Sequence, residues 1–267
     1  MTLAVCATPI GNLDDVTLRV LRELAETDLV LCEDTRRTQT LLRRHGIGAR
    51  LLSYHEHNEA ARTAEVLPRL RAGERVALVS DAGLPGISDP GGRLVRAALD
   101  AGVEVTVLPG PSAVETALVA SGLVGERFQF LGYLPRGGRA LDGLWEELRA
   151  WPHPVVAFES PQRLPATLRS LAEAQPDREV AVCRELTKRF EEVVRGSAAE
   201  VAARFPVAPK GEITLVLGAA PPSAPDDAQA VGAVRELVDA GVSRRRASEL
   251  VAGLTGVPRR RLYETSL

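Results

Sequence analysis

Short apolar runs alternate with amphipathic stretches through the first part of the chain, and this alternation restricts the folds that the sequence can adopt. Runs typical of β-strands cover 3–9, 28–34, 50–54, 75–81 and 103–109. Helical patterns lie between them at 14–26, 36–46, 58–72 and 91–101. Strands that alternate with helices in this way form parallel sheets with crossover helices. The sequence therefore predicts an α/β domain with a parallel-rich sheet over 1–114.

The pattern changes in the second half of the chain. Two strand-like runs, at 180–185 and 190–195, are too close together to have a helix between them. Such strands pair antiparallel, so we expect a second α/β domain with a mixed sheet over 115–219. The Pro/Ala-rich stretch at 220–228 is typical of a linker. Residues 229–267 are expected to form a small helical segment of two or three short helices.

Charge and cysteine content exclude several classes of protein. The 267 residues include 33 lysines and arginines against 35 aspartates and glutamates, so any nucleic-acid surface must be local. Cys6, Cys32 and Cys183 lack the spacing of a zinc site or of a disulfide framework, which predicts buried free thiols. No leader-like N-terminus and no apolar window of transmembrane length is present, which predicts a cytoplasmic protein.

Two strand-to-helix loops contain more glycine and proline than a plain connection needs. In the first, at 80–92, we predict that Asp89 caps the following helix, with Pro90 at its first position. In the second, we predict a capping box between Ser112 and Glu115. Because ligands of open α/β sheets bind at the carboxyl ends of strands, both loops are expected to face one crevice.

Common signatures of nucleotide binding and of nucleophilic catalysis are missing. The chain has no G-x-G-x-x-G after its first strand, no P-loop and no G-x-S-x-G. His55 and His57 flank Glu56, but a third metal ligand is lacking, so no metal site is expected. We favour an interpretation in which this loop contacts a polar substrate.

The segment 32–46 allows two interpretations. Glu33 and Asp34 end a strand, and Arg36 and Arg37 follow in the first turn of a helix. Capping by the acids and a basic last turn explain most of this spacing. Cations in a first turn oppose the helix dipole, however, so we expect an anion to compensate them: Glu33, Asp34 or a phosphate backbone.

Nine segments now carry a family resemblance. They are TPIGNLDD (8–15), CEDTRRTQTLL (32–42), SYHEHNE (53–59), SDAGLPGISDPG (80–91), LPGPSAVETAL (108–118), FLGYLPR (130–136), FESPQRL (158–164), CRELTKRFEEVVRG (183–196) and KGEITLVL (210–217). In this order they resemble the ribosomal RNA small subunit methyltransferase I family, whose members are 16S rRNA (cytidine-2′-O)-methyltransferases of the tetrapyrrole methylase superfamily. The resemblance covers the chain up to 218, and 243–265 is similar to the family's helical C-terminus.

The resemblance implies two α/β domains of the tetrapyrrole methylase type and a homodimer. It implies S-adenosylmethionine in the cleft between the domains. The implied substrate is one cytidine ribose in the decoding region of 16S rRNA, within the small ribosomal subunit. Ala82 stands where tetrapyrrole-methylating relatives have a proline. The resulting tripeptide Asp81-Ala82-Gly83 (DAG) resembles the corresponding sequence of the superfamily members that methylate RNA.

The resemblance also implies a set of site residues. Those expected to bind the cofactor are Thr8, Pro9, Gly11, Asp81, Ala82, Gly83, Leu84, Pro85, Pro109, Ser112, Ala113, Phe158, Glu159, Gly211 and Glu212. Those expected to bind RNA phosphate or the cofactor carboxylate are Arg36, Arg37 and Arg184. His55 is expected to bind RNA. In-line methyl transfer needs no metal but gains from a general base. Spacing leaves that base open among Asp34, Glu56, Asp89 and Lys210.

Two other functions stay open at this point. A methyltransferase acting on a tetrapyrrole or another small acceptor would need an enclosed aromatic cavity, whereas aromatic residues make up only 4% of this chain. A non-catalytic ribosome-associated module would have no need of the intact strand-end loops. The sequence also leaves open whether Arg244–Arg246 and Arg259–Arg261 contact RNA or only solvate short helices.

Overall fold

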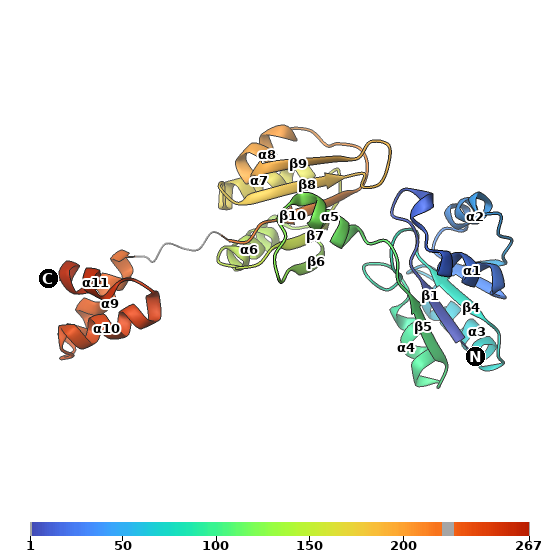
Figure 1. Cartoon of the computed structure of the whole chain (residues 1–267), viewed down its shortest axis with the longest axis horizontal. Helices are drawn as coiled ribbons and strands as arrows, with labels where there is room; N and C mark the ends of the chain where they lie inside the picture. Colours follow the sequence, from blue (N-terminus) through green and yellow to red (C-terminus); the bar gives the residue numbers. More distant parts are fainter. Residues whose placement is uncertain (1, 221–226, 267) are drawn as a thin grey trace. The chain divides into compact units, whose positions relative to one another are not determined.

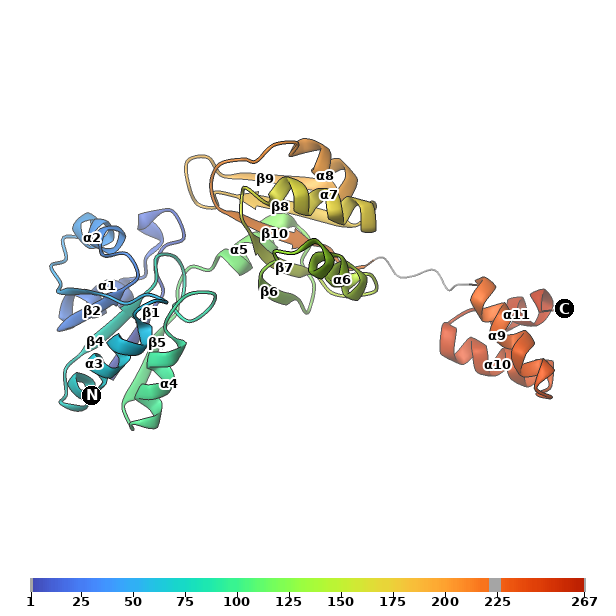
Figure 2. The same cartoon turned by 180° about the vertical axis from the view of Figure 1, so that it is seen from behind.

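The computed structural model describes residues 2–220 and 227–266 (Figures 1 and 2). The chain divides into two compact units, of which the first ends at Ala219 and the second begins at Ala220. Most of the predicted linker, 221–226, lies outside the described residues, and Asp227 already begins helix α9 (Asp227–Asp239). In the described part of the chain, no helix is long and apolar enough to cross a membrane.

The first unit begins with a five-stranded parallel sheet, as predicted. Its strands are β1 (Thr2–Cys6), β2 (Leu29–Cys32), β3 (Leu51–Ser53), β4 (Val76–Val79) and β5 (Glu104–Leu108), in the order β3-β2-β4-β1-β5. All pairings are parallel, so the carboxyl ends of the strands meet at one edge. The crossovers are η1 (Leu13–Asp15), α1 (Leu18–Glu26), α2 (Thr35–Arg44), α3 (Glu59–Arg71) and α4 (Gly92–Asp100).

Helices cover both faces of this sheet, which explains the continuous apolar strands. On one face, Leu24 of α1 and Leu42 of α2 pack with Val30 of β2. On the other face, α3 and α4 supply Val66, Leu70, Leu94 and Ala98 to a separate cluster that also contains Leu78. Strands β2 and β4 are buried along their whole length, as the central strands of such a sheet must be.

The second sheet of the same unit is mixed, which confirms the prediction of antiparallel strands. Its strands are β6 (Gln129–Tyr133), β7 (Val155–Glu159), β8 (Glu179–Arg184), β9 (Glu192–Ser197) and β10 (Ile213–Leu217), in the order β6-β7-β10-β8-β9. Only β6 and β7 pair in parallel.

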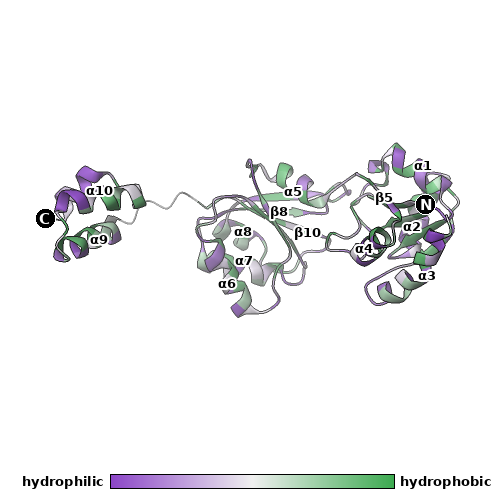
Figure 3. Cartoon of the chain, turned by 90° about the horizontal axis from the view of Figure 1, so that it is seen from below, coloured by the Kyte–Doolittle hydropathy of each residue, from purple (hydrophilic) through white to green (hydrophobic). Residues whose placement is uncertain are grey.

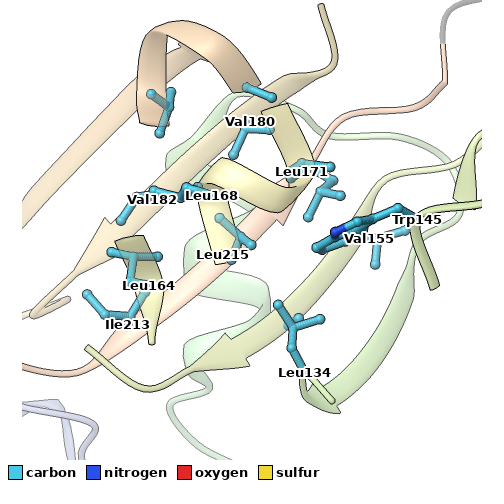
Figure 4. Packing of buried hydrophobic residues seen from close by; sticks show 14 of the residues in the cluster. Leu134, Trp145, Val155, Leu164, Leu168, Leu171, Val180, Val182, Ile213 and Leu215 are labelled. Carbon is cyan, nitrogen blue, oxygen red and sulfur yellow. The ribbon is translucent and has the colours of Figure 1, made fainter. Parts of the chain in front are cut away.

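One face of this second sheet carries α6 (Gly138–Leu148), α7 (Leu164–Ala174) and α8 (Ala198–Arg204) around the buried ring of Trp145 (Figure 4). The indole Nε1 of Trp145 donates to Ser170 Oγ at 2.9 Å, so the ring is buried without an unpaired donor. The other face is covered by α5 (Ala113–Ser121). The predicted boundary between 114 and 115 thus falls inside a helix that packs on the second sheet.

The predicted start of α4 is wrong. The helix begins at Gly92, two residues after Pro90, and its N-cap is Gly91 with a φ of 142°. The carboxylate of Glu59, at the start of α3, takes the place of an N-cap side chain: its Oε1 accepts from the backbone N–H groups of Gly91 at 3.1 Å and Arg93 at 3.3 Å. The side chain of Asp89 is therefore not needed as the cap of this helix.

The predicted capping box at the start of α5 is also wrong. The Ser112 hydroxyl donates to the Glu115 carboxylate, and it makes no bond to the backbone of the first turn. The two side chains that should each satisfy a backbone N–H satisfy each other instead. A complete capping box occurs at the start of α8, between Ser197 and Glu200, where the sequence analysis did not predict one.

The three cysteines are buried and free, as predicted. Burial raises the pKa of the Cys6 thiol to about 12, that of Cys32 to about 11 and that of Cys183 to about 12. The thiols therefore stay protonated and behave as small apolar groups.

The second unit is a group of three helices with a core of its own. Helix α9 packs with α10 (Arg244–Thr255) and α11 (Arg259–Thr265). The core contains Ala230, Val231, Val234, Ala247, Val251, Val257 and Leu262. The prediction of short helices at the C-terminal end is confirmed.

The Glu59 cap gives a test of the fold. We expect Glu59→Ala to lower the free energy of unfolding by about 1–2 kcal/mol, because two N–H groups at the start of α4 lose their acceptor. Glu65→Ala, on the same helix, is the matched control: it removes an exposed ion pair with Arg62 and should cost less than about 0.5 kcal/mol. Urea unfolding of both variants measures the difference. Equal costs would show that Glu59 does not cap α4.

Candidate active site

The strand-end loops of the first sheet face the second sheet across a cavity of about 710 Å³. This volume lies within the range of small-molecule sites. From the first sheet, the cavity is lined by Ile10, Glu33, Arg37, Asp81–Leu84, Ile87–Asp89 and Pro109–Ser112. From α5 and the second sheet, it is lined by Ala113–Glu115, Tyr133, Phe158–Pro161, Cys183, Leu186 and Gly211–Thr214. We call this space the large cavity.

A second cavity of about 300 Å³ adjoins it. Its wall includes Thr8, Pro9, Gly11, Thr38 and Lys188. The two cavities share lining residues, namely Ile10, Arg37, Asp81, Ala82 and Glu212. We call this space the small cavity.

Close backbone approach fixes the loops that enclose the large cavity. Thr8 and Gly83 exchange two backbone hydrogen bonds, of 2.8 and 3.0 Å, so the loops after β1 and β4 are joined. Gly83 has a φ of 78°, which favours glycine. At Gly110 a Cβ would lie 2.9 Å from the Ala7 Cβ, so the loop after β5 also needs glycine. Glycine is therefore favoured at Gly83 by the backbone conformation and required at Gly110 by close packing.

A polar junction joins the loop after β1 to the loop between β8 and β9. A Cβ on Gly11 would lie 2.5 Å from Lys188 Cγ and 2.8 Å from the Leu186 carbonyl oxygen. The Lys188 ammonium pairs with Glu185 Oε1 at 2.8 Å and with Glu212 Oε2 at 2.9 Å. Glu185 has a φ of 53°, in the left-handed region that non-glycine residues rarely adopt. These ion pairs brace the strained loop itself, and the Asn12 backbone N–H, which donates to Thr187 Oγ1 at 3.0 Å, joins it to the loop after β1.

The wall of the large cavity is acidic. Glu33, Asp81, Asp89, Glu115 and Glu212 line it together with the buried Glu159, and Arg37 is the only basic residue among the described residues of the lining. Burial, with the nearby charge of Glu33, raises the pKa of Asp89 to about 6. Burial also raises the pKa of Glu33 and of Asp81. A wall of this charge favours a cationic ligand, which would relieve the repulsion between the carboxylates.

Asp81 connects the cavity to the start of α2. Its Oδ1 accepts from the Asp34 backbone N–H at 3.0 Å, and its Oδ2 lies 3.5 Å from Arg37 Nη1. Asp34 itself is the N-cap of α2: its Oδ1 accepts from the Arg36 N–H at 2.8 Å. The Arg36 guanidinium also binds this carboxylate and holds the pKa of Asp34 well below its usual range. Capping is thus the interpretation of Asp34 and Arg36 that the structure supports.

The structure places several predicted site residues outside both cavities. Asp34, Glu56 and Lys210, proposed as bases, line neither of them, and Glu56 and Lys210 are exposed. Arg36, His55 and Arg184, proposed to bind RNA, also line neither cavity, and neither does Pro85, proposed to bind the cofactor. Among the residues that the structure describes, no cluster of three or more potential ligands is arranged to hold a metal ion.

Glu159 lines the large cavity but its carboxylate is already engaged. The side chain is fully buried, and it accepts from Thr167 Oγ1 at 2.6 Å and from the Ser160 N–H at 2.6 Å. Arg163 Nη2 forms an ion pair with Glu159 Oε2 at 3.2 Å. Glu159 therefore fixes the end of β7 against α7.

Two parts of the wall were missed in the sequence. Tyr133 lies edge-on to Phe158, with ring centroids 5.6 Å apart, because β6 pairs with β7. Lys188 is one of only two lysines, but nothing in its local sequence indicated that it contacts Gly11. The segments FLGYLPR and CRELTKRFEEVVRG were the only signal for either residue.

Comparison with known proteins gives a consistent result. Residues 2–202 match the family model of the tetrapyrrole (corrin/porphyrin) methylases. A ribosomal RNA small subunit methyltransferase I of Thermotoga maritima is 48% identical over 219 residues, which cover 80% of this chain and 97% of that protein. The protein of the same name from Mycobacterium tuberculosis is 46% identical over 265 residues, covering 98% of this chain and 93% of its own length.

Solved structures share the fold at lower identity. The methyltransferase CobJ superposes with a TM-score of 0.62 at 21% identity, covering 82% of this chain and 93% of its own. A uroporphyrin-III C-methyltransferase of Thermus thermophilus, solved in complex with S-adenosyl homocysteine, has a TM-score of 0.59 at 19% identity. It covers 82% of this chain and 97% of its own.

Adding one methyl group at Gly11 tests whether the two loops pack closely there. Gly11→Ala should lower the free energy of unfolding by about 1–3 kcal/mol, because the added Cβ overlaps a backbone oxygen and the Lys188 side chain. Gly48→Ala is the control, since a Cβ there meets no atom within 4 Å. It should be neutral or stabilise by up to about 1 kcal/mol. Urea unfolding measures the free energy of unfolding of both variants. Equal values would show that Gly11 is not closely packed at this junction.

Proposed function

Since this chain belongs to the tetrapyrrole methylase family and, within it, to the ribosomal RNA small subunit methyltransferase I family, we propose that it methylates the ribose 2′-oxygen of a cytidine in 16S rRNA. It is a methyltransferase of the tetrapyrrole methylase fold. The proposed methyl donor is S-adenosylmethionine, and the proposed target lies in the decoding region of the small ribosomal subunit. A homodimer stays a prediction of the family resemblance, and a cytoplasmic location stays a prediction from the sequence.

The acidic large cavity is the observation that carries the proposal for the donor. S-adenosylmethionine supplies a methyl group on a positively charged sulfur, and it also carries an ammonium group. The carboxylates of Glu33, Asp81 and Asp89 face the space in which such charges would lie. Leu84 and Phe158 offer apolar contacts for an adenine, and the loop from Pro109 to Ala113 brings backbone groups to the wall. The carboxylates, apolar side chains and backbone groups of the wall fit this ligand, and so does the size of the cavity.

Asp89 is the proposed general base. Of the four candidates from the sequence, it is the one that lines the large cavity, since Asp34 caps α2 and the other two are exposed. Its carboxylate would accept the proton of the ribose 2′-hydroxyl as the oxygen bonds to the methyl carbon in line, while the bond from that carbon to sulfur breaks and the thioether product leaves. A base with a pKa near 6 is ionised at neutral pH and still basic enough to accept a proton.

Arg37 is proposed to meet the RNA where the two cavities join. It lines both of them, its side chain is 60% exposed, and its contact with Asp81 is long at 3.5 Å. A phosphate could therefore bind the guanidinium without first breaking a buried ion pair. Arg36, by contrast, makes two bonds to Asp34.

Labelled methyl transfer tests the proposed function. The protein is incubated with S-adenosylmethionine labelled in the methyl group and with small ribosomal subunits, free 16S rRNA or a porphyrinoid. We expect label on one cytidine ribose of the rRNA. Label on the porphyrinoid alone would replace the proposal by a small-acceptor methyltransferase, and no label on any acceptor would favour a binding module.

The role of Asp89 has a pH signature. The rate of methyl transfer should be highest above pH 6 and fall as the pH drops through about 6, because the protonated carboxyl accepts no proton. Asp89→Asn should lower the single-turnover rate by about 10²–10⁴-fold and remove this inflection. Affinity for S-adenosylmethionine, measured by calorimetry, should fall by far less than the rate, because Glu33 and Asp81 still line the cavity in this variant. Glu126→Gln, at an exposed site outside both cavities, is the control. An unchanged rate in Asp89→Asn would exclude it as the base.

A further inference from the structure

The helical second unit concentrates positive charge at two helix starts. Arg244–Arg246 form the first turn of α10, and Arg259–Arg261 form the first turn of α11. From 241 to 266 the chain has six arginines and only two acidic residues, Glu249 and Glu264. Figure 3 shows hydrophilic stretches, coloured purple, on α10.

Both acidic residues of this segment are already paired. Glu249 binds Arg246 at 3.1 Å, and Glu264 binds Arg260 at 2.8 Å. Arg244, Arg245 and Arg259 form no ion pair with any residue that the structure describes. Arg245 and Arg259 are exposed, and the Nε of Arg244 is buried without a hydrogen-bond partner. Net positive charge is therefore left on this surface.

The location of these arginines makes an external anion favourable. A helix N-terminus carries partial positive charge, so cations in a first turn are disfavoured unless an anion is bound. Ser243, the N-cap of α10, makes no side-chain bond to the free N–H groups of that helix. A phosphate at such a helix start would interact with both the guanidinium and the backbone N–H groups.

An aromatic group lies beside the second triplet. Tyr263 follows Arg259 by four residues on α11, so both lie on one face of the helix, and Tyr263 is 46% exposed. Arginine together with an exposed ring is the combination with which proteins bind phosphates and stack bases of unpaired RNA. This combination favours RNA over an acidic protein surface.

One relative is shorter than this chain by about the length of the second unit. The 219 residues matched in the Thermotoga maritima protein make up 97% of it but only 80% of this chain. That protein is thus too short to have counterparts of both units, although it bears the same name as the longer relative from Mycobacterium tuberculosis. The unmatched share is about the size of the second unit, which begins at Ala220.

We propose that the second unit binds the phosphate backbone of the RNA substrate, with Arg244, Arg245 and Arg259 as its contacts and Tyr263 as a stacking surface. The inference rests on the proposed function for the identity of the substrate. Arg245 and Arg259 add affinity and take no part in the transfer step.

Salt dependence tests this in the full chain. The double variant Arg245→Gln with Arg259→Gln removes two exposed cations and leaves Arg244 in place. Its control is Arg19→Gln with Arg22→Gln, which removes two exposed cations from α1. Affinity for a 16S rRNA transcript and for small ribosomal subunits is measured between 50 and 200 mM salt. We expect the slope of log K against log salt to become shallower by about 1.4–1.8 in the double variant and to stay unchanged in the control.

The methyl-transfer assay separates the two proposals. In the double variant, kcat at saturating subunits should equal that of the parent, and KM for the subunits should rise. Equal slopes for variant and parent, or equal changes in variant and control, would overturn the inference. Weaker binding to subunits with unchanged binding to the transcript would indicate a ribosomal protein as the partner and would also overturn it. A parent that binds RNA with the expected slope but labels no cytidine would refute the proposed function alone.

Discussion

Parallel pairing of β1 with both β4 and β5 is the constraint on which the candidate site depends. It brings the ends of three strands to one edge, where their loops must pack closely. The two hydrogen bonds between Thr8 and Gly83, and the contact of Gly110 with Ala7, are the direct result. The sheet can hold this register because apolar helices bury both of its faces. Packing far from the cavity therefore fixes the backbone of its wall.

The second sheet completes the site through a different interaction. Its loop between β8 and β9 reaches Gly11, where Thr187 Oγ1 accepts from the Asn12 backbone N–H, and ion pairs of Lys188 with Glu185 and Glu212 fix the loop itself. Half-buried ion pairs of this kind add specificity of position more than stability. They suit a loop with two non-glycine residues, Glu185 and Thr187, at positive φ. Strain in this loop is thus balanced by ion pairs that the loops of the second sheet make among themselves.

The sequence predicted the elements of the fold well, because their signals are local. Continuous apolar runs such as Val76–Val79 gave the buried strands, and the short spacing between β8 and β9 gave the mixed sheet. The start of α4 was mispredicted because its cap comes from Glu59, more than 30 residues earlier in the chain. The Ser112–Glu115 pair has the right spacing for a capping box, but spacing does not reveal which acceptor a hydroxyl will choose.

The candidate site was predictable where it follows strand ends. The loops containing Asp81, Asp89 and Pro109 line the large cavity, as their positions after β4 and β5 imply. Tyr133 and Lys188 were missed because only tertiary pairing brings them to the wall. Asp34 and Glu159 have the right chemistry, but the partners of their carboxylates become visible only in three dimensions.

The long contact between Arg37 and Asp81 has a thermodynamic consequence. Any anion that engages the Arg37 guanidinium would weaken the only cation beside Asp81 in the acidic wall. The wall would then attract a cationic ligand more strongly. Linkage is reciprocal, so the cationic ligand would in turn favour the anion by the same factor. If the proposed methyl donor and the RNA phosphate bind as inferred above, each would therefore strengthen the binding of the other through the Arg37 side chain.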